Sequence, residues 1–393
     1  MLDSIYVGMS GLSAYAEGLR VISNNAANLN TPGFKSASLQ FGDMVYSTDG
    51  SSGGVGGQLG FGVGTFGTSL NFKQGDMQDT GNVLDLGVDG QGLFTVLDGA
   101  GMLHYTRDGQ FTFNSDGVLV DKTDRAKVIG IDANGAQASF TLDGFRNNAA
   151  KPTTKVSFNG NISTSETTVS VNGISVIDSG GTTHALTLTL TNNQATTPGE
   201  WLASIKDGTT EVGTGKLEFT SGDVIDPSTA KLTFSYKPAS MPAQSVTLDF
   251  SADVTSWAGG TSKIAQTSHD GVVAGELTGV TFDATGTIVY AYSNGQTTKG
   301  NRLQLARFDT TDAVKTHGDN QFDATNPAQW HTGTAGDLGF GNIKSGVVEV
   351  SNVDLSQEFS ELVIMQRGYQ ASSQVVSTAN EMLQQLFSMT NGR

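Results

Sequence analysis

The stretch "NNAANLNTPGFK" (Asn24–Lys35) ends a long apolar segment at the start of the chain. Proline lacks a backbone N–H and disfavours the helical conformation at the residue before it, so Pro32 predicts that a helix stops here. The order Thr-Pro-Gly-Phe is typical of a type II turn, in which Pro32 and Gly33 are central and Gly33 supplies the positive φ. We expect Phe34 to anchor this turn in apolar surroundings.

The segment before this turn and the end of the chain share one apolar pattern. In both, apolar residues recur every seven positions, with a second row three or four residues away. This 3–4 spacing is the a/d pattern of a coiled coil, so we predict that the two ends form helices that pair with each other. The alternative is two ordinary amphipathic helices packed on a sheet. The residues predicted to make assembly contacts through these terminal helices are Leu2, Ile5, Met9, Leu12, Ala16, Leu19, Ala26, Leu355, Leu362, Met365, Tyr369, Val376, Ala379, Leu383 and Leu386.

The second predicted helix carries amides where a solvated coiled coil carries charges. Six glutamines lie between Gln357 and Gln385, whereas Glu and Lys usually flank a coiled-coil seam. Uncharged amides suit a crowded contact with other protein, or a wet lumen, better than open water. Because isolated helices of this length are marginal in water, we expect partners to order both ends. Asp354 followed by Gln357 predicts a capping box at the start of this helix.

Between the two ends the sequence predicts β-structure. Apolar and polar residues alternate in "HALTLTLTNN", "KLTFSYK" and "SVTLDF", which is the period of a half-buried strand. Asn172-Gly173 separates two strand-like runs and predicts a two-residue hairpin. The residues expected on the buried faces are Leu186, Leu188, Leu190, Leu232, Phe234, Tyr236, Val246, Leu248 and Phe250.

The composition changes near "RNNAAKPTT" (146–154) and near "GGTSKIAQTSHDG" (259–271), which marks an inserted β-rich block. We therefore predict a mainly β fold with α-helical termini and nested, discontinuous domains, in which the terminal helices pair as a coiled coil. The expected divisions are a terminal helical domain of residues 1–34 and 353–393, connecting segments 35–71 and 340–352, an all-β inner domain of residues 72–145 and 270–339, and an inserted all-β outer domain of residues 146–269.

Charge and composition exclude several classes of protein. The chain of 393 residues has a formal charge of −16, and an acidic body repels nucleic acid because phosphate binding needs clustered Lys and Arg. No apolar run approaches the length of about 18 residues that spans a bilayer, and we expect no cleaved secretory signal. The absence of cysteine excludes disulfides and Cys-ligated metal sites.

The motifs of catalysis and cofactor binding lack their sequence context. "GVGTFG" (62–67) has the G-x-G-x-x-G spacing, but a dinucleotide site needs a strand before it and a helix after it. We predict a flexible or tightly turned linker there instead. No G-x-S-x-G elbow supports a catalytic triad, so we expect no enzyme, cofactor or metal site. The histidines are too widely spaced for a metal motif; they are His104, His184, His269, His317 and His331.

Four stretches of the chain carry a recurring set of short motifs. They are "SGLSAYAEGLRVISNNAANLNTPGFKSA" (10–37), "FKQGDMQDTGNVLDLGVDGQGLFTV" (72–96), "YTRDGQFTFNSDGVLVD" (105–121) and "EVSNVDLSQEFSELVIMQRGYQASSQVVSTANEMLQQL" (349–386). Together they resemble the rod and hook family of bacterial flagellar axial proteins. The extra β-rich block at about 150–265 makes the chain more similar to the hook members of the family, because the rod members are shorter and have one outer domain. The family's turn falls on Asn28, Thr31, Pro32, Gly33, Phe34 and Lys35.

The resemblance implies a structural subunit of the flagellar hook, in the extracellular flagellum, exported without a cleaved signal peptide. It implies a curved tubular homopolymer that encloses the export channel and transmits torque from rod to filament as a flexible universal joint. The implied partners are further copies of the chain, the hook cap protein, distal rod and hook–filament junction proteins and the flagellar type III export apparatus. It implies no nucleic acid and no membrane insertion.

Two other interpretations stay open. "NLNTPGFK" (28–35) resembles the distal-rod form of the turn, which favours a distal-rod axial protein with an inserted domain. A secreted carbohydrate-binding β-protein would instead use Trp201, Trp257 and Trp330 as surface residues. The paired heptad patterns at the two ends argue against that class.

Overall fold

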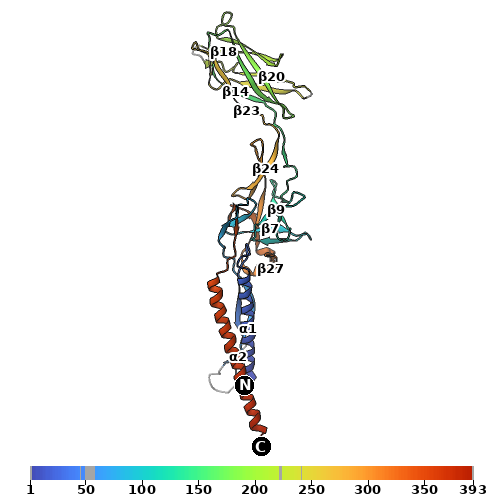
Figure 1. Cartoon of the computed structure of the whole chain (residues 1–393), viewed down its shortest axis with the longest axis vertical. Coiled ribbons are helices and arrows are strands. Elements are labelled where there is room, and N and C mark those ends of the chain that lie inside the picture. The colour runs from blue at the N-terminus through green and yellow to red at the C-terminus, as the bar shows by residue number, and fades with distance from the viewer. Residues whose placement is uncertain (1, 45, 49–57, 221–223, 240, 392–393) are drawn as a thin grey trace. The chain divides into compact units, whose positions relative to one another are not determined.

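The computed structural model describes residues 2–44, 46–48, 58–220, 224–239 and 241–391. It has one helix near each end of the chain and strands between them (Figure 1). The chain forms two compact units, of which the first is Met1–Leu142, Val280–Val289 and Lys299–Arg393 and the second is Asp143–Gly279 and Tyr290–Thr298. The prediction of a mainly β protein with helical termini and a nested order is therefore confirmed.

The first unit contains both long helices, two 3₁₀ helices and many short strands. Its helices are α1 (Leu2–Ala27), α2 (Leu355–Asn391), η1 (Thr311–Ala313) and η2 (Pro327–Gln329). Its strands are β1 (Ala37–Asp43), β2 (Tyr46–Thr48), β3 (Gln58–Gly60), β4 (Val63–Leu70), β5 (Met77–Asp79), β6 (Leu86–Asp89), β7 (Leu93–Leu97), β8 (Leu103–Thr106), β9 (Phe111–Phe113), β10 (Leu119–Asp121), β11 (Lys127–Ile131), β12 (Gln137–Ser139), β27 (Val314–Gly318), β28 (Gln321–Ala324), β29 (Trp330–Thr334), β30 (Asn342–Ser345) and β31 (Val347–Glu349). Residues of both units belong to β24 (Gly275–Phe282), β25 (Thr287–Tyr292) and β26 (Thr297–Phe308).

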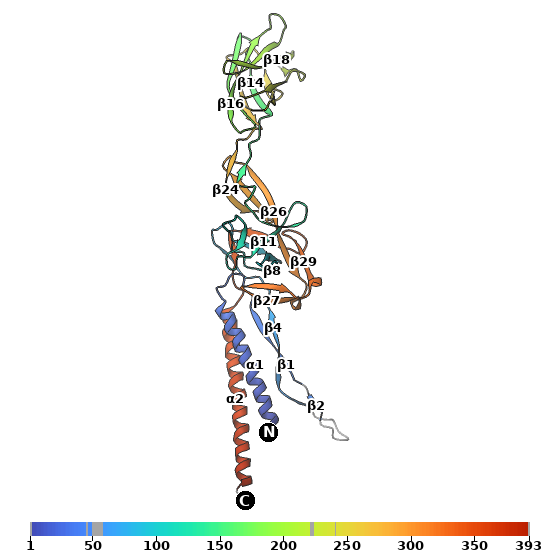
Figure 2. The ribbon, with the colours of Figure 1, turned by 90° about the vertical axis from the view of Figure 1, so that its right-hand side faces the viewer.

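The helices α1 and α2 run antiparallel beside each other, as both ribbon views show (Figure 2). At the start of α2 the Asp354 carboxylate accepts hydrogen bonds from the backbone N–H groups of Ser356 (2.8 Å) and Gln357 (3.3 Å). This satisfies two of the N–H groups that a helix leaves unpaired at its start. Among the described residues, no helix is both long enough and apolar enough to cross a membrane.

The main sheet of the first unit joins strands that are distant in sequence. In the order β26-β11-β7-β8-β28-β27 every neighbouring pair is antiparallel. Phe94 and Phe111 meet edge to face in its core, with ring centroids 5.2 Å apart. Two further pairings, β30 with β6 and β31 with β5, return the chain to the segment at residues 77–89 just before α2 begins.

The second unit has its own sheet and its own core. Its strands are β13 (Asn147–Asn148), β14 (Lys155–Asn161), β15 (Thr168–Ile177), β16 (Thr183–Asn192), β17 (Glu200–Asp207), β18 (Thr210–Thr220), β19 (Val224–Ile225), β20 (Lys231–Tyr236), β21 (Gln244–Asp249), β22 (Val254–Thr255) and β23 (Lys263–His269). Trp201 is fully buried, and the rings of Phe158 and Phe250 stack 4.7 Å apart. All nine residues predicted for the buried strand faces are buried, so the alternation of the sequence is confirmed.

Two local predictions were wrong. Asn172-Gly173 does not form a hairpin, because β15 continues through it and pairs with β16 on both sides of a bulge between Val171 and Ile174. Gly173 has a φ of +73°, which suits a bulge as well as a turn. The other concerns "GVGTFG" (62–67), predicted to be a linker: residues 63–67 lie inside β4, and no helix follows the motif. Strand β4 pairs with β1 in a two-stranded antiparallel sheet within the segment 35–71, which was predicted to be a connection.

Candidate assembly site

The contact between α1 and α2 repeats every seven residues. The helices are antiparallel, so moving seven residues toward the start of α1 reaches the next facing pair seven residues further along α2. A seven-residue period keeps one face of each helix against its partner. One end of the seam is polar, because the Asn25 amide donates a hydrogen bond to Glu358 Oε1 (2.9 Å) there. The facing pairs are Asn25 with Glu358, Gly18 with Met365, and Gly11 with Ser372.

Glycines bring the two helix backbones close together. A Cβ atom on Gly8 would lie 2.6 Å from Val376 Cγ2, and one on Gly368 would lie 2.5 Å from the Tyr15 ring. Glycine in a helix interior costs about 1 kcal/mol relative to alanine. The close approach of the helices supplies the physical reason for glycine at these positions.

The face of α1 that lies closest to α2 differs from the predicted row of large residues. The residues of α1 that are buried are Gly8, Gly11, Ala14, Gly18, Ile22 and Asn25. The predicted residues Ile5, Leu12, Ala16, Leu19 and Ala26 are only half-buried, and Met9 is exposed. The side chain of Leu2 lies outside the described residues. The prediction took large apolar side chains as the seam, whereas the residues at the closest approach are mostly small.

On α2, residues from both predicted rows face α1. Met365 and Val376 pack against the glycines of α1, and Ala379 is almost completely buried. Leu362 and Leu383 are half-buried. The remaining predicted residues, Leu355, Tyr369 and Leu386, are exposed.

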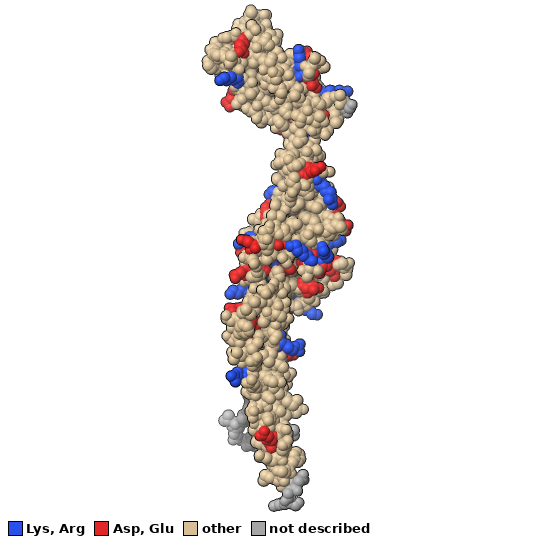
Figure 3. Space-filling model, viewed as in Figure 1, with Lys and Arg blue, Asp and Glu red and all other residues tan. Residues whose placement is uncertain are grey.

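The outer surface of the helix pair carries little charge and many exposed apolar side chains. Figure 3 shows few charged atoms on the visible face of α1 and α2. Exposed apolar side chains gathered on one part of a protein indicate an interaction site. The exposed apolar residues of the pair are Tyr6, Val7, Met9, Leu355, Phe359, Val363, Ile364, Tyr369, Val375, Met382, Leu386, Phe387 and Met389.

The turn after α1 forms as predicted. The Phe34 N–H donates to the Thr31 carbonyl (3.2 Å), which closes the turn around Pro32 and Gly33. Gly33 has a φ of +69°, as the third residue of a type II turn requires. A Cβ there would lie 2.5 Å from the backbone nitrogen of Asp108, so the turn is packed directly on another segment. Phe34 itself is half-buried, and the Asn28 side chain accepts a hydrogen bond from Thr31 (3.1 Å).

Behind this turn a buried ion cluster joins all four family-like stretches. Glu349 Oε1 accepts from Lys35 Nζ (2.5 Å) and from the backbone N–H of Gly75 (2.9 Å). Its other oxygen, Oε2, accepts from Arg107 Nη1 (2.8 Å). The side chains of Lys35 and Glu349 are fully buried. Arg107 Nη2 also donates to the carbonyl of Gly90 (2.7 Å), so each charge has several partners.

Burial governs the protonation of this region. Burial lowers the pKa of Lys35, while the Glu349 carboxylate opposes that change by its charge and its hydrogen bond. Burial also lowers the pKa of Arg107. It raises the pKa of Asp108, the next residue, to about 6, and the nearby charge of Asp121 acts in the same direction.

Two asparagines fasten the helices to the β-part of the same unit. Asn25 exchanges hydrogen bonds with the backbone of Ala37 at the start of β1, donating at 2.8 Å and accepting at 3.0 Å. Asn352 accepts from the Ser36 N–H (2.7 Å) and donates to the carbonyl of Lys73 (2.9 Å). The ends of both helices are therefore fixed to the strand that follows the turn.

Sequence reasoning missed most of this site. Glu349 and Arg107 lie inside the quoted stretches, but 242 residues separate them along the chain. Local sequence patterns do not connect residues so far apart. The packing of β1 and β4 on α1 was also missed, although Thr65 Oγ1 donates to Glu17 (2.7 Å) and Ser10 Oγ accepts from the Val63 N–H (3.2 Å).

The tryptophans do not form a carbohydrate-binding surface. Trp201 is in the core of the second unit, and the Trp330 ring stacks on Tyr105 at 4.2 Å. Of the three residues, Trp257 is the exposed one, with 48% of the residue's surface accessible. The prediction that all three lie on the surface was wrong.

Comparison with known proteins gives matches along the whole chain. Three family models match: "Flagella basal body rod protein" at residues 5–35, "Flagellar hook protein FlgE/F/G D1 domain" at residues 87–147, and "Flagellar basal body rod FlgEFG protein C-terminal" at residues 344–389. The chain is 29% identical over 409 residues to the flagellar hook protein FlgE of Escherichia coli (strain K12), with 97% of this chain and 98% of that one covered. It is 28% identical over 448 residues to the flagellar hook protein FlgE of Borreliella burgdorferi, with 100% of both covered. The crystal structure of Helicobacter pylori flagellar hook protein FlgE2 matches with a TM-score of 0.49 and 13% identity, over 70% of this chain and 100% of that chain.

Proposed function

The chain belongs to the family of flagellar hook proteins and is a structural subunit of the hook, and from its geometry we propose that copies assemble through their terminal helices. The observation that carries this proposal is the apolar surface left on the helix pair, where Ile364 is 63% and Phe387 is 67% exposed. Each Å² of apolar surface removed from water stabilises by about 25 cal/mol. Burying this surface against other copies is the most direct use of it.

In the proposed polymer, the terminal helices form the inner layer of a curved tube around an export channel. The amide-rich, charge-poor surface of α2 supports this, because it suits a crowded or wet lumen. The tube transmits torque from rod to filament as a flexible joint. Its further partners are the hook cap, the distal rod and junction proteins and the type III export apparatus.

Concentration-dependent light scattering of purified chain tests the helix contact. Ile364→Asn and Phe387→Asn each remove exposed apolar surface from α2, so we expect a higher critical concentration for assembly. The matched control is Leu338→Asn, since Leu338 is 100% exposed outside the helices. A control that loses assembly as the helix variants do, or helix variants that assemble normally, would contradict the proposal.

The location in the flagellum distinguishes the hook from the distal rod. The relatives named hook protein match the full chain, inserted block included, which favours the hook. Immunogold electron microscopy with antibody raised to residues 155–260 tests this on isolated flagella. We expect gold on the short curved segment between basal body and filament; label confined to the straight rod would favour the distal-rod alternative.

A further inference from the structure

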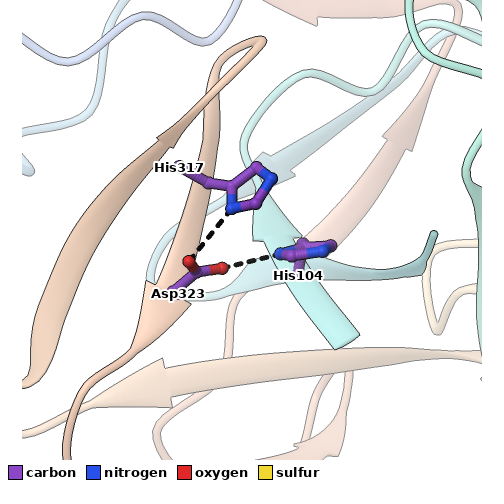
Figure 4. A group of neighbouring side chains, drawn as sticks. All are labelled: His104, His317 and Asp323. Carbon is purple, nitrogen blue, oxygen red and sulfur yellow. Dashed lines mark hydrogen bonds and ion pairs between the residues drawn. The ribbon is translucent and has the colours of Figure 1, made fainter. Parts of the chain in front are cut away.

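Two histidines and an aspartate meet on three adjacent strands of the first unit. His104 is on β8, Asp323 on β28 and His317 on β27, and Figure 4 shows their side chains turned toward one another. Phe322 and Tyr105 pair across β28 and β8 and belong to the core on one face of the sheet. Asp323 and His104 are the next residues along those strands, so they lie on the opposite face.

Sequence spacing could not reveal this cluster. The predicted absence of a metal site rested on the distance between histidines along the chain, yet the rings of His104 and His317 lie 4.2 Å apart. A bulge between Thr316 and Gly318 gives β27 an extra residue at this point, and that residue is His317. Bulges of this kind re-aim side chains.

The hydrogen bonds around a neutral His104 are incomplete. Its Nδ1 lies 2.6 Å from Asp323 Oδ1, and its Nε2 lies 3.4 Å from Asp98 Oδ2. The ring is 2% exposed, and Nε2 is buried without a hydrogen-bond partner. A neutral imidazole has one N–H, so it can satisfy one carboxylate but not two. The other oxygen of Asp323 faces His317 Nδ1 at 3.0 Å.

We propose that His104, His317 and Asp323 bind a divalent transition-metal ion, with zinc as the best match. Imidazole and carboxylate ligands suit Zn²⁺, which takes three protein ligands and a water molecule at open sites. Here His104 and His317 bind through Nδ1. The Nε2–H of His104 then donates to Asp98, which is the carboxylate–histidine–metal arrangement that orients such ligands.

The geometry needs only small side-chain movements. Zinc–ligand distances of about 2.0–2.2 Å place two ligand atoms about 3.3 Å apart across a tetrahedral angle. The present separations of 2.6 and 3.0 Å from the two nitrogens to Asp323 are slightly shorter. His317 and Asp323 have side chains 47% and 35% exposed, so both are free to adjust and one ligand position faces solvent.

The other histidine–aspartate contacts provide the comparison. His184 with Asp178 and His331 with Asp309 are single pairs, each 2.9 Å apart. Among the described residues, the cluster at His104 alone brings three potential metal ligands within 4.8 Å of one another. His331 is as exposed as His317 and is therefore a matched control.

Titration calorimetry with zinc chloride tests the proposal on the full chain, kept monomeric and near neutral pH. We expect one ion per chain, at least a tenfold loss of affinity in His317→Gln and in Asp323→Asn, and unchanged binding in His331→Gln. Asp98→Asn should weaken binding by about 10- to 100-fold without abolishing it, because Asp98 only orients a ligand. X-ray absorption should detect two imidazoles on the bound zinc and one in His317→Gln.

The proposal is overturned if the full chain binds zinc more weakly than about 100 µM, or if His317→Gln binds as the unsubstituted chain does. Equal losses in His331→Gln and His317→Gln would also overturn it, because they would indicate unspecific surface binding. Circular dichroism of each variant excludes loss of folding as the cause. None of these readouts depends on assembly of the polymer.

Discussion

At the scale of single residues, Glu349 joins several distant parts of the first unit. Its carboxylate binds Lys35, Arg107 and the backbone of Gly75, which come from three other parts of the sequence. Buried ion pairs are not always stabilising overall, because each charge loses its hydration. They do fix geometry, and here one anion determines where the turn after α1, the strand β8 and the start of α2 meet.

Replacement of Glu349 by Gln should destabilise the first unit strongly. The amide removes the negative charge but keeps the volume, so two buried cations face each other without compensation. Loss of one partner from a buried pair costs about 3–5 kcal/mol. Urea unfolding, followed by circular dichroism, measures the change. The control is Lys344→Gln, which breaks the exposed contact with Asp89 and should leave stability unchanged; equal stability of Glu349→Gln and the control would contradict the assigned role.

Asp108 should make the first unit less stable as the pH rises through its titration range. Its pKa is raised from 3.8 to about 6, so the folded state holds the proton more tightly than the unfolded state does. The stability this gives is complete below about pH 4 and is lost as the pH rises toward and past about 6.

The variant Asp108→Asn removes this dependence because its amide is neutral throughout. It can still accept the hydrogen bond from the Gln110 N–H, which Asp108 Oδ1 accepts at 3.0 Å. We expect Asp108→Asn to be more stable than the parent by up to about 3 kcal/mol above pH 7 and equal to it near pH 4. Urea unfolding across this range measures the difference, and a difference that grows on acidification would show that the sign is wrong.

At the scale of elements, the helix pair shows what a heptad pattern can and cannot predict. Apolar periodicity correctly indicated two pairing helices, because the 3–4 spacing continues along both ends of the chain. It failed to identify the contact face of α1, since Gly8, Gly11 and Gly18 contribute backbone rather than side chain. The row of large residues was more visible in the sequence, and much of it remains half-buried or exposed.

Gly368→Ala tests whether close helix approach is required. Alanine favours an isolated helix by about 1 kcal/mol over glycine, so propensity alone predicts a more helical chain. The new Cβ would, however, lie 2.5 Å from the Tyr15 ring, which also packs on Phe41. We expect the steric effect to dominate and assembly, measured by light scattering, to slow at least tenfold.

The control for this variant is Ser373→Ala on the exposed side of α2. It raises helix propensity without entering the seam, so its assembly should match that of the parent chain. If Gly368→Ala assembles as fast as Ser373→Ala, the two helices do not need the observed approach and the glycines have another role.

The alternation of apolar and polar residues predicted strands that bury one face. It did not predict strands that are partly exposed on both faces. Leu186, Leu188 and Leu190 alternate with threonine and are all fully buried. The β1–β4 sheet lacks such a signal, because its residues are partly exposed on both faces and rich in glycine. The cluster of His104, His317 and Asp323 had no sequence signal either, because its members come from three strands that only the sheet order brings together.

At the scale of the whole molecule, the net charge is unevenly distributed along the chain. The formal charge is −16, and residues 1–42 contribute none of it, because Asp3 and Glu17 balance Arg20 and Lys35. Self-repulsion between copies therefore acts mainly through the middle of the chain, while the helical ends approach one another with little of it. Low charge at the ends and high charge elsewhere are both consistent with a subunit that packs by its termini.

The second unit should fold without the rest of the chain. Its core is a continuous cluster from Val156 to Val254, with Ile264 packed against it, and the backbones of Lys151 and Val272 exchange two hydrogen bonds of 2.8 and 2.9 Å that bring its ends together. We expect a fragment of residues 151–272 to be a folded monomer. Its calorimetric transition should reproduce one of two transitions of the full chain.

Trp201→Ala identifies which transition belongs to this unit. Trp201 is fully buried in that cluster, and loss of a buried Trp side chain costs about 3–5 kcal/mol. We expect the variant to lower the melting temperature of the fragment and of the matching transition in the full chain, while the other transition stays in place. If both transitions of the full chain move together, the two cores are thermodynamically coupled, and the insertion cannot be treated as an independent domain carried by the helical subunit.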